Sequence, residues 1–320
     1  MKKILITVLI ALALIALALV DFGQIIDRFS PKEEKTCTLT ENGKTVRIGM
    51  DARELTQAFG TAKDTFVSEY GFDWNIYHNN FQNYIQIGTQ DGVVTGIYTN
   101  SAEFSFEGFG VGSAKDEIEA RYGEPLDGIV KGNTRYLSNG TEDGANFSIY
   151  RLGGAYVTFF YDTYSNNSLT SVNIIDCDVE QAFDMLYAPP TQDLAESFEK
   201  QSFYVTNALR VRDGLVPFEY HEKLGELAFA HSADMVKNGY FSHNSQNGDT
   251  VLERAKKQNI NFSAIGENLA MGAQNSLYMH ELLMNSEGHR ANILSDFTHI
   301  GTGVAFGDDG TPYLTQNFLK

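Results

Sequence analysis

Three polar residues in the last third of the chain have side chains that could do chemistry. His243 follows two aromatic residues and a serine, while Glu267 and His289 each follow a glycine. Such positions are typical of loops and element edges, where binding residues collect. Two imidazoles and a carboxylate can hold a divalent metal such as zinc, or form an acid/base pair with a group that orients it. They lie 24 and 22 residues apart, so only the fold can bring them together.

Helices and strands that could position these residues are predicted around them. Thr250 with Glu253 is a capping box that opens a helix, and the chain alternates around Asp308-Asp309-Gly310 as a hairpin does. Helices and strands therefore interleave, as in an α/β or α+β domain. Apolar residues recur at helical spacing in three further segments: 194–209, 224–235 and 276–285.

Two other histidines in this region have simpler interpretations. His231 has apolar neighbours at helical spacing, so we expect it in the core. His280-Glu281 begins like the helix of a zinc protease, but Met284 stands where that motif requires its second histidine. We therefore expect neither to act as a metal ligand.

An earlier module ends at Pro189-Pro190, since consecutive prolines stop helices and strands. It contains a repeat, in which Ile48-Gly49 leads to Gly60 and Val111-Gly112 leads to Gly123. Each copy predicts a short helix packed on a three-stranded antiparallel meander. The predicted strands are 74–77, 84–88 and 93–99 in the first copy, and 145–151, 156–161 and 169–175 in the second.

Little in this module predicts catalysis. Four aromatic residues on the predicted strands could line a carbohydrate-binding face, but aromatics on a half-buried sheet favour a core role. They are Trp74, Tyr77, Tyr84 and Tyr98. The acids Asp176, Asp178 and Glu180 could suggest a metal, but solvated carboxylates at a strand end are the simpler interpretation.

The N-terminus is typical of an exported protein. Lys2 and Lys3 precede a seventeen-residue run, 4–20, that is apolar except for Thr7. Cleavage at Ala16-Leu17-Ala18 would release the chain, whereas an uncleaved segment would anchor it to the membrane. We favour the anchor because the apolar run continues through the cleavage site. Either alternative places the body outside the cytoplasm, and an anchored chain keeps its N-terminus inside.

Composition narrows the classes of partner. The chain of 320 residues has 24 basic and 41 acidic side chains and a net charge of −17, so we expect no nucleic-acid partner. Its two cysteines, Cys37 and Cys177, are too few for a disulfide scaffold. Outside the cytoplasm they could form one disulfide or remain two thiols, and spacing does not choose between these alternatives.

The C-terminal motifs resemble those of a bacterial CAP/SCP domain, the superfamily of cysteine-rich secretory proteins, antigen 5 and pathogenesis-related proteins. The preceding module resembles the CAP-associated N-terminal domain of some Gram-positive bacteria, through its repeated Ile/Val-Gly motifs and residues 74–77. The C-terminal motifs are Asn207-Ala208-Leu209-Arg210, Ala230-His231-Ser232-Ala233-Asp234-Met235, Tyr240-Phe241-Ser242-His243, Gly266-Glu267-Asn268-Leu269-Ala270, the run 284–294 and Thr315-Gln316-Asn317-Phe318.

The resemblance implies an α-β-α sandwich with a cleft lined by two histidines and two acids. His243, Glu267 and His289 match three of these positions. The fourth position, an acid in the family, falls near Ser286. Glu287 is adjacent and Glu281 lies a turn earlier, but neither is assigned the missing role. This departure weakens the case for catalysis.

The resemblance leaves three functions open. The first is a non-enzymatic module at the cell surface that binds a lipid, glycan or peptide in the cleft. The second is a metal-assisted hydrolase, with His243 and His289 holding the metal and Glu267 activating water. The third is a structural protein that acts through the N-terminal module.

The predicted class is α+β throughout, and the predicted organisation has five segments. These are a signal anchor or signal peptide at 1–20, a tether at 21–43, the repeat module at 44–188, a linker at 189–192 and the CAP/SCP domain at 193–320.

Overall fold

A computed structural model describes residues 36–137 and 146–320. Thr36–Lys320 forms one compact unit. The predicted anchor or signal at 1–20 and most of the tether lie outside the described residues. Within the described ranges, no helix is both long enough and apolar enough to cross a bilayer. We call residues 36–188 the N-terminal half and residues 189–320 the C-terminal half.

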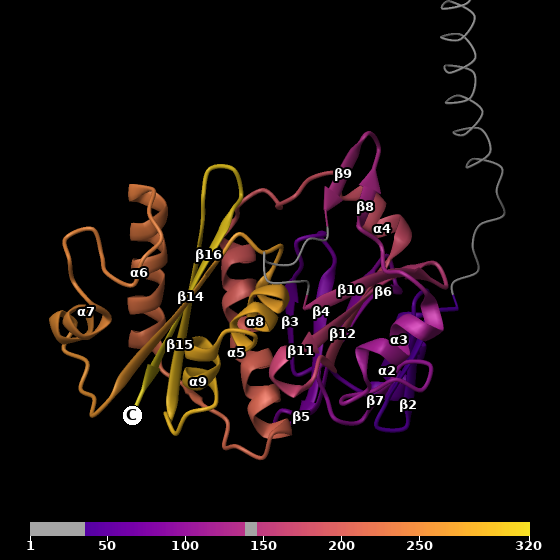
Figure 1. Ribbon diagram of the computed structural model, residues 1–320, viewed down its shortest axis with the longest axis horizontal. Helices are drawn as coiled ribbons and strands as arrows, with labels where there is room; N and C mark the ends of the chain where they lie inside the picture. Colours follow the sequence, from indigo (N-terminus) through magenta and orange to yellow (C-terminus); the bar gives the residue numbers. More distant parts are fainter. Residues whose placement is uncertain (1–35, 138–145) are drawn as a thin grey trace, which may run out of the picture. The chain divides into compact units, whose positions relative to one another are not determined.

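The N-terminal half is built on a seven-stranded antiparallel sheet (Figure 1). Both predicted meanders form, and pairing of β6 with β12 joins them into this one sheet, which the repeat did not predict. Strand β3 was also missed. In sheet order the strands are β10 (Phe147–Leu152), β11 (Ala155–Asp162), β12 (Ser168–Asp176), β6 (Val93–Thr99), β5 (Gln82–Gln90), β4 (Asp73–Asn79) and β3 (Asp64–Val67).

The two predicted repeat helices also form, and each ends at a glycine as expected. Gly60 and Gly123 have φ values of 81° and 82°, a region that favours glycine. The helices are α2 (Ala52–Phe59) and α3 (Lys115–Tyr122). Smaller elements complete this half: β1 (Thr38–Glu41), β2 (Lys44–Arg47), β7 (Phe104–Ser105), the hairpin β8 (Gly128–Lys131) and β9 (Thr134–Leu137), the short helix η1 (Thr163–Ser165), and α4 (Cys177–Ala182).

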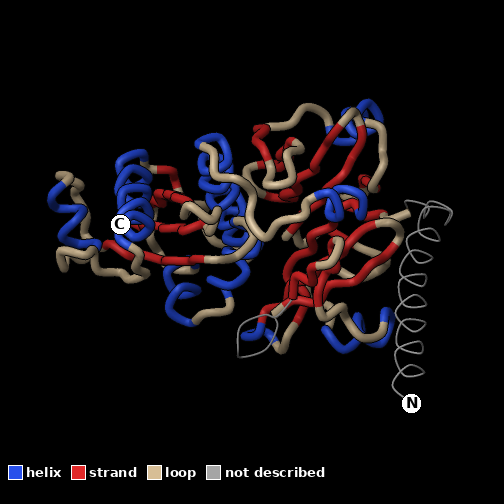
Figure 2. The backbone as a smooth tube through the Cα atoms, turned by 90° about the horizontal axis from the view of Figure 1, so that it is seen from above, coloured by secondary structure: helices blue, strands red, loops and turns tan. Residues whose placement is uncertain are grey.

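The C-terminal half is an α-β-α sandwich, so the α+β prediction is confirmed. Its four strands have the order β13-β15-β16-β14, and helices flank them on both sides (Figures 1 and 2). The strands are β13 (Glu219–Tyr220), β14 (Ile265–Met271), β15 (His299–Phe306) and β16 (Pro312–Leu319). The helices are α5 (Gln192–Arg212), α6 (Glu222–Asn238), α7 (Val251–Lys257), α8 (Ser276–Met284) and α9 (Glu287–Ile293).

Helix α6 packs unusually closely on β15 because two strand positions lack a side chain. A Cβ at Gly303 would lie 1.9 Å from the backbone nitrogen of Phe229, and one at Gly301 would lie 2.2 Å from that of Gly225. Only glycine allows this approach. The close contact fixes α6 against the strands that lead to the candidate site.

The predicted aromatic core is confirmed. Trp74, Tyr84 and Tyr98 are at most 1% exposed, and they share one hydrophobic cluster with Val205 and Leu277 of the C-terminal half. Tyr77 is partly buried against a second cluster of the N-terminal half. Trp74, Tyr84 and Tyr98 therefore pack in the contact between the halves and do not line an exposed carbohydrate-binding face.

The interpretation of the acids near the end of β12 as solvated was wrong for two of them. Asp176 is 2% exposed and caps α4 by accepting from the backbone N–H of Asp178. Glu180 is 4% exposed and forms an ion pair with Lys131 at 2.5 Å. Burial next to a lysine from a separate hairpin was not visible in the local sequence.

Both cysteines are buried beside one turn of the N-terminal half. The backbone N–H of Cys37 donates to the carbonyl of Gly153, and that of Cys177 donates to the carbonyl of Gly154. Burial raises the pKa of the Cys37 thiol to about 12, and the charges of Glu107 and Cys177 act in the same direction. A disulfide between Cys37 and Cys177 and two separate thiols stay the two alternatives.

Candidate functional site

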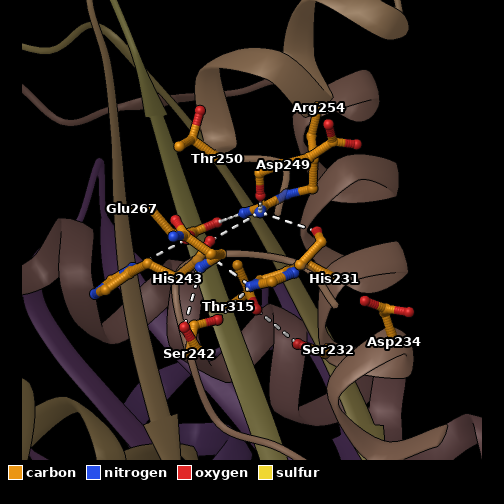
Figure 3. A network of polar contacts seen from close by, with 12 residues as sticks. His231, Ser232, Asp234, Ser242, His243, Asp249, Thr250, Arg254, Glu267 and Thr315 are labelled. Atoms are coloured by element: carbon orange, nitrogen blue, oxygen red, sulfur yellow. Dashed lines mark hydrogen bonds and ion pairs between the residues drawn. The ribbon is translucent and has the colours of Figure 1, made fainter. Parts of the chain in front are cut away.

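Three separate elements carry the predicted site residues. His243 lies in the loop between α6 and α7, Glu267 lies in β14, and His289 lies in α9. The Glu267 side chain is only 2% exposed, whereas the His243 side chain is 56% exposed. In Figure 3, Glu267 lies between His243 and Arg254. The fold therefore brings two of the predicted residues into direct contact.

Both carboxylate oxygens of Glu267 have partners. Nδ1–H of His243 donates to Oε1 at 3.0 Å, and Nη2 of Arg254 donates to Oε2. The amide of Asn317, oriented with its nitrogen toward Glu267, donates to Oε2 at 3.1 Å. Glu267 is thus a buried carboxylate with a hydrogen bond to each oxygen, and buried charges are generally paired in this way.

Arg254, which sequence analysis did not identify, is the centre of this network. Its Nη2 pairs with Glu267. Its Nη1 donates to the carbonyls of His243 at 2.9 Å and Asp249 at 3.0 Å. One guanidinium therefore holds the carboxylate and the loop that carries His243 (Figure 3). The predicted capping box at Thr250 and Glu253 forms and starts the helix that presents Arg254. That capping box was the only sequence signal that pointed to this segment.

His231 is buried, as predicted, but it also borders the site. It is 1% exposed, and its Nε2 donates to the carbonyl of Ser242 at 2.9 Å. The same nitrogen lies 4.0 Å from Oε1 of Glu267. Burial lowers the pKa of His231, and the nearby charge of Glu267 opposes that shift. This histidine therefore supports the loop that carries His243.

His289 approaches the network from α9. Burial lowers the pKa of His289, and the charge of His243 lowers it further. The amide of Asn268 donates to the carbonyl of His289 at 3.1 Å, and that of Asn292 donates to the carbonyl of Glu267 at 3.2 Å. These amides fix α9 to β14 and set the position of His289.

No acid takes the fourth family position. Ser286 precedes α9 as its N-cap residue, and its side chain makes no capping hydrogen bond. Glu287 is exposed in the first turn of α9. Glu281 is buried instead in the contact with the N-terminal half, where Oε1 accepts from Ser171 at 2.5 Å and Tyr98 at 3.1 Å.

The arrangement does not fit a three-ligand metal site. Glu267 is already neutralised by a guanidinium, and a second cation beside Arg254 would be repelled. Across residues 36–137 and 146–320, no group of three or more His, Cys, Asp or Glu side chains could hold a metal ion. His243, Glu267 and His289 as arranged therefore do not form the zinc site considered from sequence.

A zinc titration tests this geometry. We expect calorimetry to detect no tight zinc site that depends on His243 and His289, because the third ligand is held by Arg254. Wild type and the double variant His243→Ala/His289→Ala should give the same heats. A site present in wild type and absent from the double variant would contradict the arrangement.

The group of the site that remains available to a ligand is therefore the exposed imidazole of His243. Because Nδ1–H of His243 donates to Glu267, a neutral His243 presents Nε2 as a hydrogen-bond acceptor. Phe241, 46% exposed, lies two residues earlier in the same loop. A cavity of about 410 Å³ adjoins the network, and its lining includes His231, Asp249 and Arg254.

Comparison with known proteins gives two successive family matches. Residues 48–185 match the CAP-associated N-terminal family, and residues 203–318 match the cysteine-rich secretory protein (CAP) family. The two matches together cover most of the described chain.

Individual relatives agree with this order. The chain is 29% identical over 290 residues to an uncharacterized membrane protein of Bacillus subtilis, YlbC, covering 85% of this chain and 82% of that protein. It is 38% identical over 124 residues to B. subtilis YkwD, covering 38% of this chain and 47% of that protein. A crystal structure of an extracellular SCP-domain protein from Bacillus anthracis superposes with a TM-score of 0.74 at 24% identity, covering 85% of this chain and 93% of the other, which shows the shared fold.

Proposed function

This chain carries a CAP domain of the cysteine-rich secretory protein family behind a CAP-associated N-terminal domain, and from this premise we propose that it is a binding protein of the bacterial cell envelope. The apolar segment 4–20 would anchor it to the membrane, with the body outside the cytoplasm. Two relatives support this location: YlbC is named a membrane protein, and the B. anthracis protein is described as extracellular.

One observation favours a binding function over a catalytic one. Both oxygens of Glu267 are already held, by Arg254 on one side and His243 on the other. A general base must reach the proton that it abstracts, and here the carboxylate is 2% exposed and both of its oxygens already accept hydrogen bonds within the protein. The carboxylate fixes the direction of His243 and supports a preformed surface.

The recognition groups would be those that this surface exposes. Nε2 of His243 can accept a hydrogen bond, and Phe241 offers an exposed ring. His289 is carried by α9, which Asn292 links to the carbonyl of Glu267. Hydroxyl or amide donors beside an apolar patch match such a surface. A glycan or a peptide chain of the envelope supplies both, and a lipid headgroup with hydroxyls is a further ligand of the same chemistry.

The test is mass spectrometry of molecules that co-purify with the full chain. We expect a ligand to be retained by wild type and reduced about five- to tenfold in His243→Ala, because one hydrogen-bonding group is lost at the surface. Asn244→Ala, which changes the neighbouring exposed residue, is the matched control and should retain the ligand. Equal recovery from wild type and His243→Ala would refute this use of the site.

Hydrolysis is the second candidate, and one contact favours it. A carboxylate that accepts from Nδ1 of a histidine orients the imidazole as a general base. Among the described residues, however, the His243 side chain hydrogen-bonds to Glu267 alone. His243 therefore activates no serine or threonine hydroxyl there. Turnover of a peptide or cell-wall substrate by wild type, lost in Glu267→Gln and in His243→Ala, would favour hydrolysis over binding.

A further inference from the structure

A small cavity lies on the N-terminal half, formed by elements that take no part in the His243 site. It has a volume of about 180 Å³ and is lined by β1, β2 and the turn between them, by the end of α2 and the loop after it, and by β4 and β5. Because two of its lining residues are Lys44 and Lys63, we call it the lysine cavity. Sites for drug-sized molecules measure about 300–1,000 Å³, so this one has room for a single small group.

The two lysines of the lining carry positive charge that no acid compensates. Lys44 and Lys63 are exposed, and neither forms an ion pair with a residue that the structure describes. Acids outnumber bases in the chain by 41 to 24, so partners are in excess. Six other basic side chains of this half do pair with an acid: Arg47, Arg53, Lys115, Arg121, Lys131 and Arg135.

The acid in the lining, Glu41, has its carboxyl group turned into the protein. The residue is 1% exposed, and its Oε1 accepts from the hydroxyl of Ser101 at 2.8 Å. Burial raises the pKa of Glu41 to about 7, although hydrogen bonds from Ser101 and Thr99 oppose the shift. A ligand that enters from solvent therefore meets the charge of the two lysines first.

An aromatic pair keeps the Lys44 ammonium at the wall. Its Nζ lies 5.3 Å from the centroid of the Phe59 ring at the end of α2, and Phe59 packs on Tyr77 with 5.6 Å between ring centroids. All three residues line the cavity. A cation over an aromatic ring is attracted to it and keeps its charge, so this ammonium stays available to an anion.

Neutral donors accompany the lysines in the lining. Nδ1 of His78 accepts from the backbone N–H of Phe81 at 2.9 Å, so the neutral imidazole carries its proton on Nε2. Thr61 and Asn79 are exposed lining residues, with a hydroxyl and an amide that can donate. Ammonium groups with neutral N–H and O–H donors are a set that binds phosphate oxygens.

We propose that the lysine cavity binds a phosphate group, either free or at the end of a larger molecule. A phosphate monoester carries a charge of about −1.5 to −2 at pH 7, which the two ammonium groups match. The rest of this acidic chain repels such an anion, so its binding should depend on both lysines. The site is independent of the function proposed for His243, and either proposal can fail alone.

The test is calorimetry on the purified full chain at pH 7 and constant ionic strength, with glycerol 3-phosphate, inorganic phosphate and acetate as probes. We expect a phosphate to bind at least about tenfold more tightly than acetate, which carries a single charge. Similar binding of glycerol 3-phosphate and inorganic phosphate supports a terminal phosphate as the ligand, and preference for inorganic phosphate supports a free one. Absence of binding by both phosphates, or equal binding of acetate, would overturn the proposal.

Variants at exposed positions locate the binding. Lys44→Gln and Lys63→Gln should each weaken phosphate binding about tenfold, because each removes one charge-assisted hydrogen bond. Their melting temperatures should stay those of wild type, since neither lysine forms an ion pair among the described residues, and Lys63→Arg should retain binding. Lys115→Gln is the matched control: it removes the same charge from this half, from a lysine that pairs with Glu119 and lies outside the lining. If Lys115→Gln weakens binding as much as Lys44→Gln and Lys63→Gln do, the effect is one of net charge and the site is refuted.

Discussion

Arg254→Ala is expected to lower the free energy of unfolding by about 3–5 kcal/mol, the range for breaking a buried ion pair by removing one partner. The Arg254 side chain is 10% exposed and that of Glu267 is 2% exposed, so the remaining carboxylate would be buried without its cation. The variant also loses the hydrogen bonds to the carbonyls of His243 and Asp249. Urea unfolding followed by circular dichroism measures the change.

The neighbouring pair of Lys257 with Asp249 provides the matched control. Lys257 lies on the same helix, but its side chain is 62% exposed. Exposed ion pairs contribute at most about 1 kcal/mol, so Lys257→Ala should change stability little. If Arg254→Ala costs no more than Lys257→Ala, Arg254 does not organise the site.

Glu281→Gln is expected to make the protein progressively more stable than wild type as the pH rises from about 4.5 to above 7. Burial raises the pKa of Glu281 to about 7, with hydrogen bonds from Ser171 and Tyr98 and the charge of Arg212 opposing the shift. A carboxyl group with a raised folded-state pKa stabilises the fold while protonated, and that stabilisation is lost as pH rises through the folded-state pKa. The relative gain should reach about 3 kcal/mol.

Comparing the variant with wild type is necessary because other buried groups also titrate. Burial lowers the pKa of His280 to about 3, so this neighbour acts in the opposite direction as the pH changes. Subtracting the two unfolding curves at each pH leaves the contribution of residue 281. Glu226→Gln, on the exposed face of α6, should show no such trend. A difference between Glu281→Gln and wild type that is the same at pH 5 and pH 8 would contradict the assignment.

Local sequence predicted the helices that carry Arg254 and Glu281, but it predicted the buried contacts of neither side chain. The capping box before Arg254 predicted a helix start, and the helix forms there. Nothing in that segment indicated that its arginine would meet a carboxylate on β14. Glu281 likewise stood in a helix with an incomplete zinc-protease motif, and its burial depends on Ser171 and Tyr98 of the other half.

The sequence by itself determined the repeat, the family and most of the longer helices and strands. Hydrophobic period, glycine stops and turn residues are local properties, so the two meanders and their helices were predictable. The C-terminal sandwich was implied by the family resemblance. Tertiary structure decided which edges joined the meanders into one sheet, which cation neutralised Glu267, and which acids became buried. The physical reason is that the free energy of a buried polar group depends on partners brought by distant segments, and the period of one segment carries no information about them.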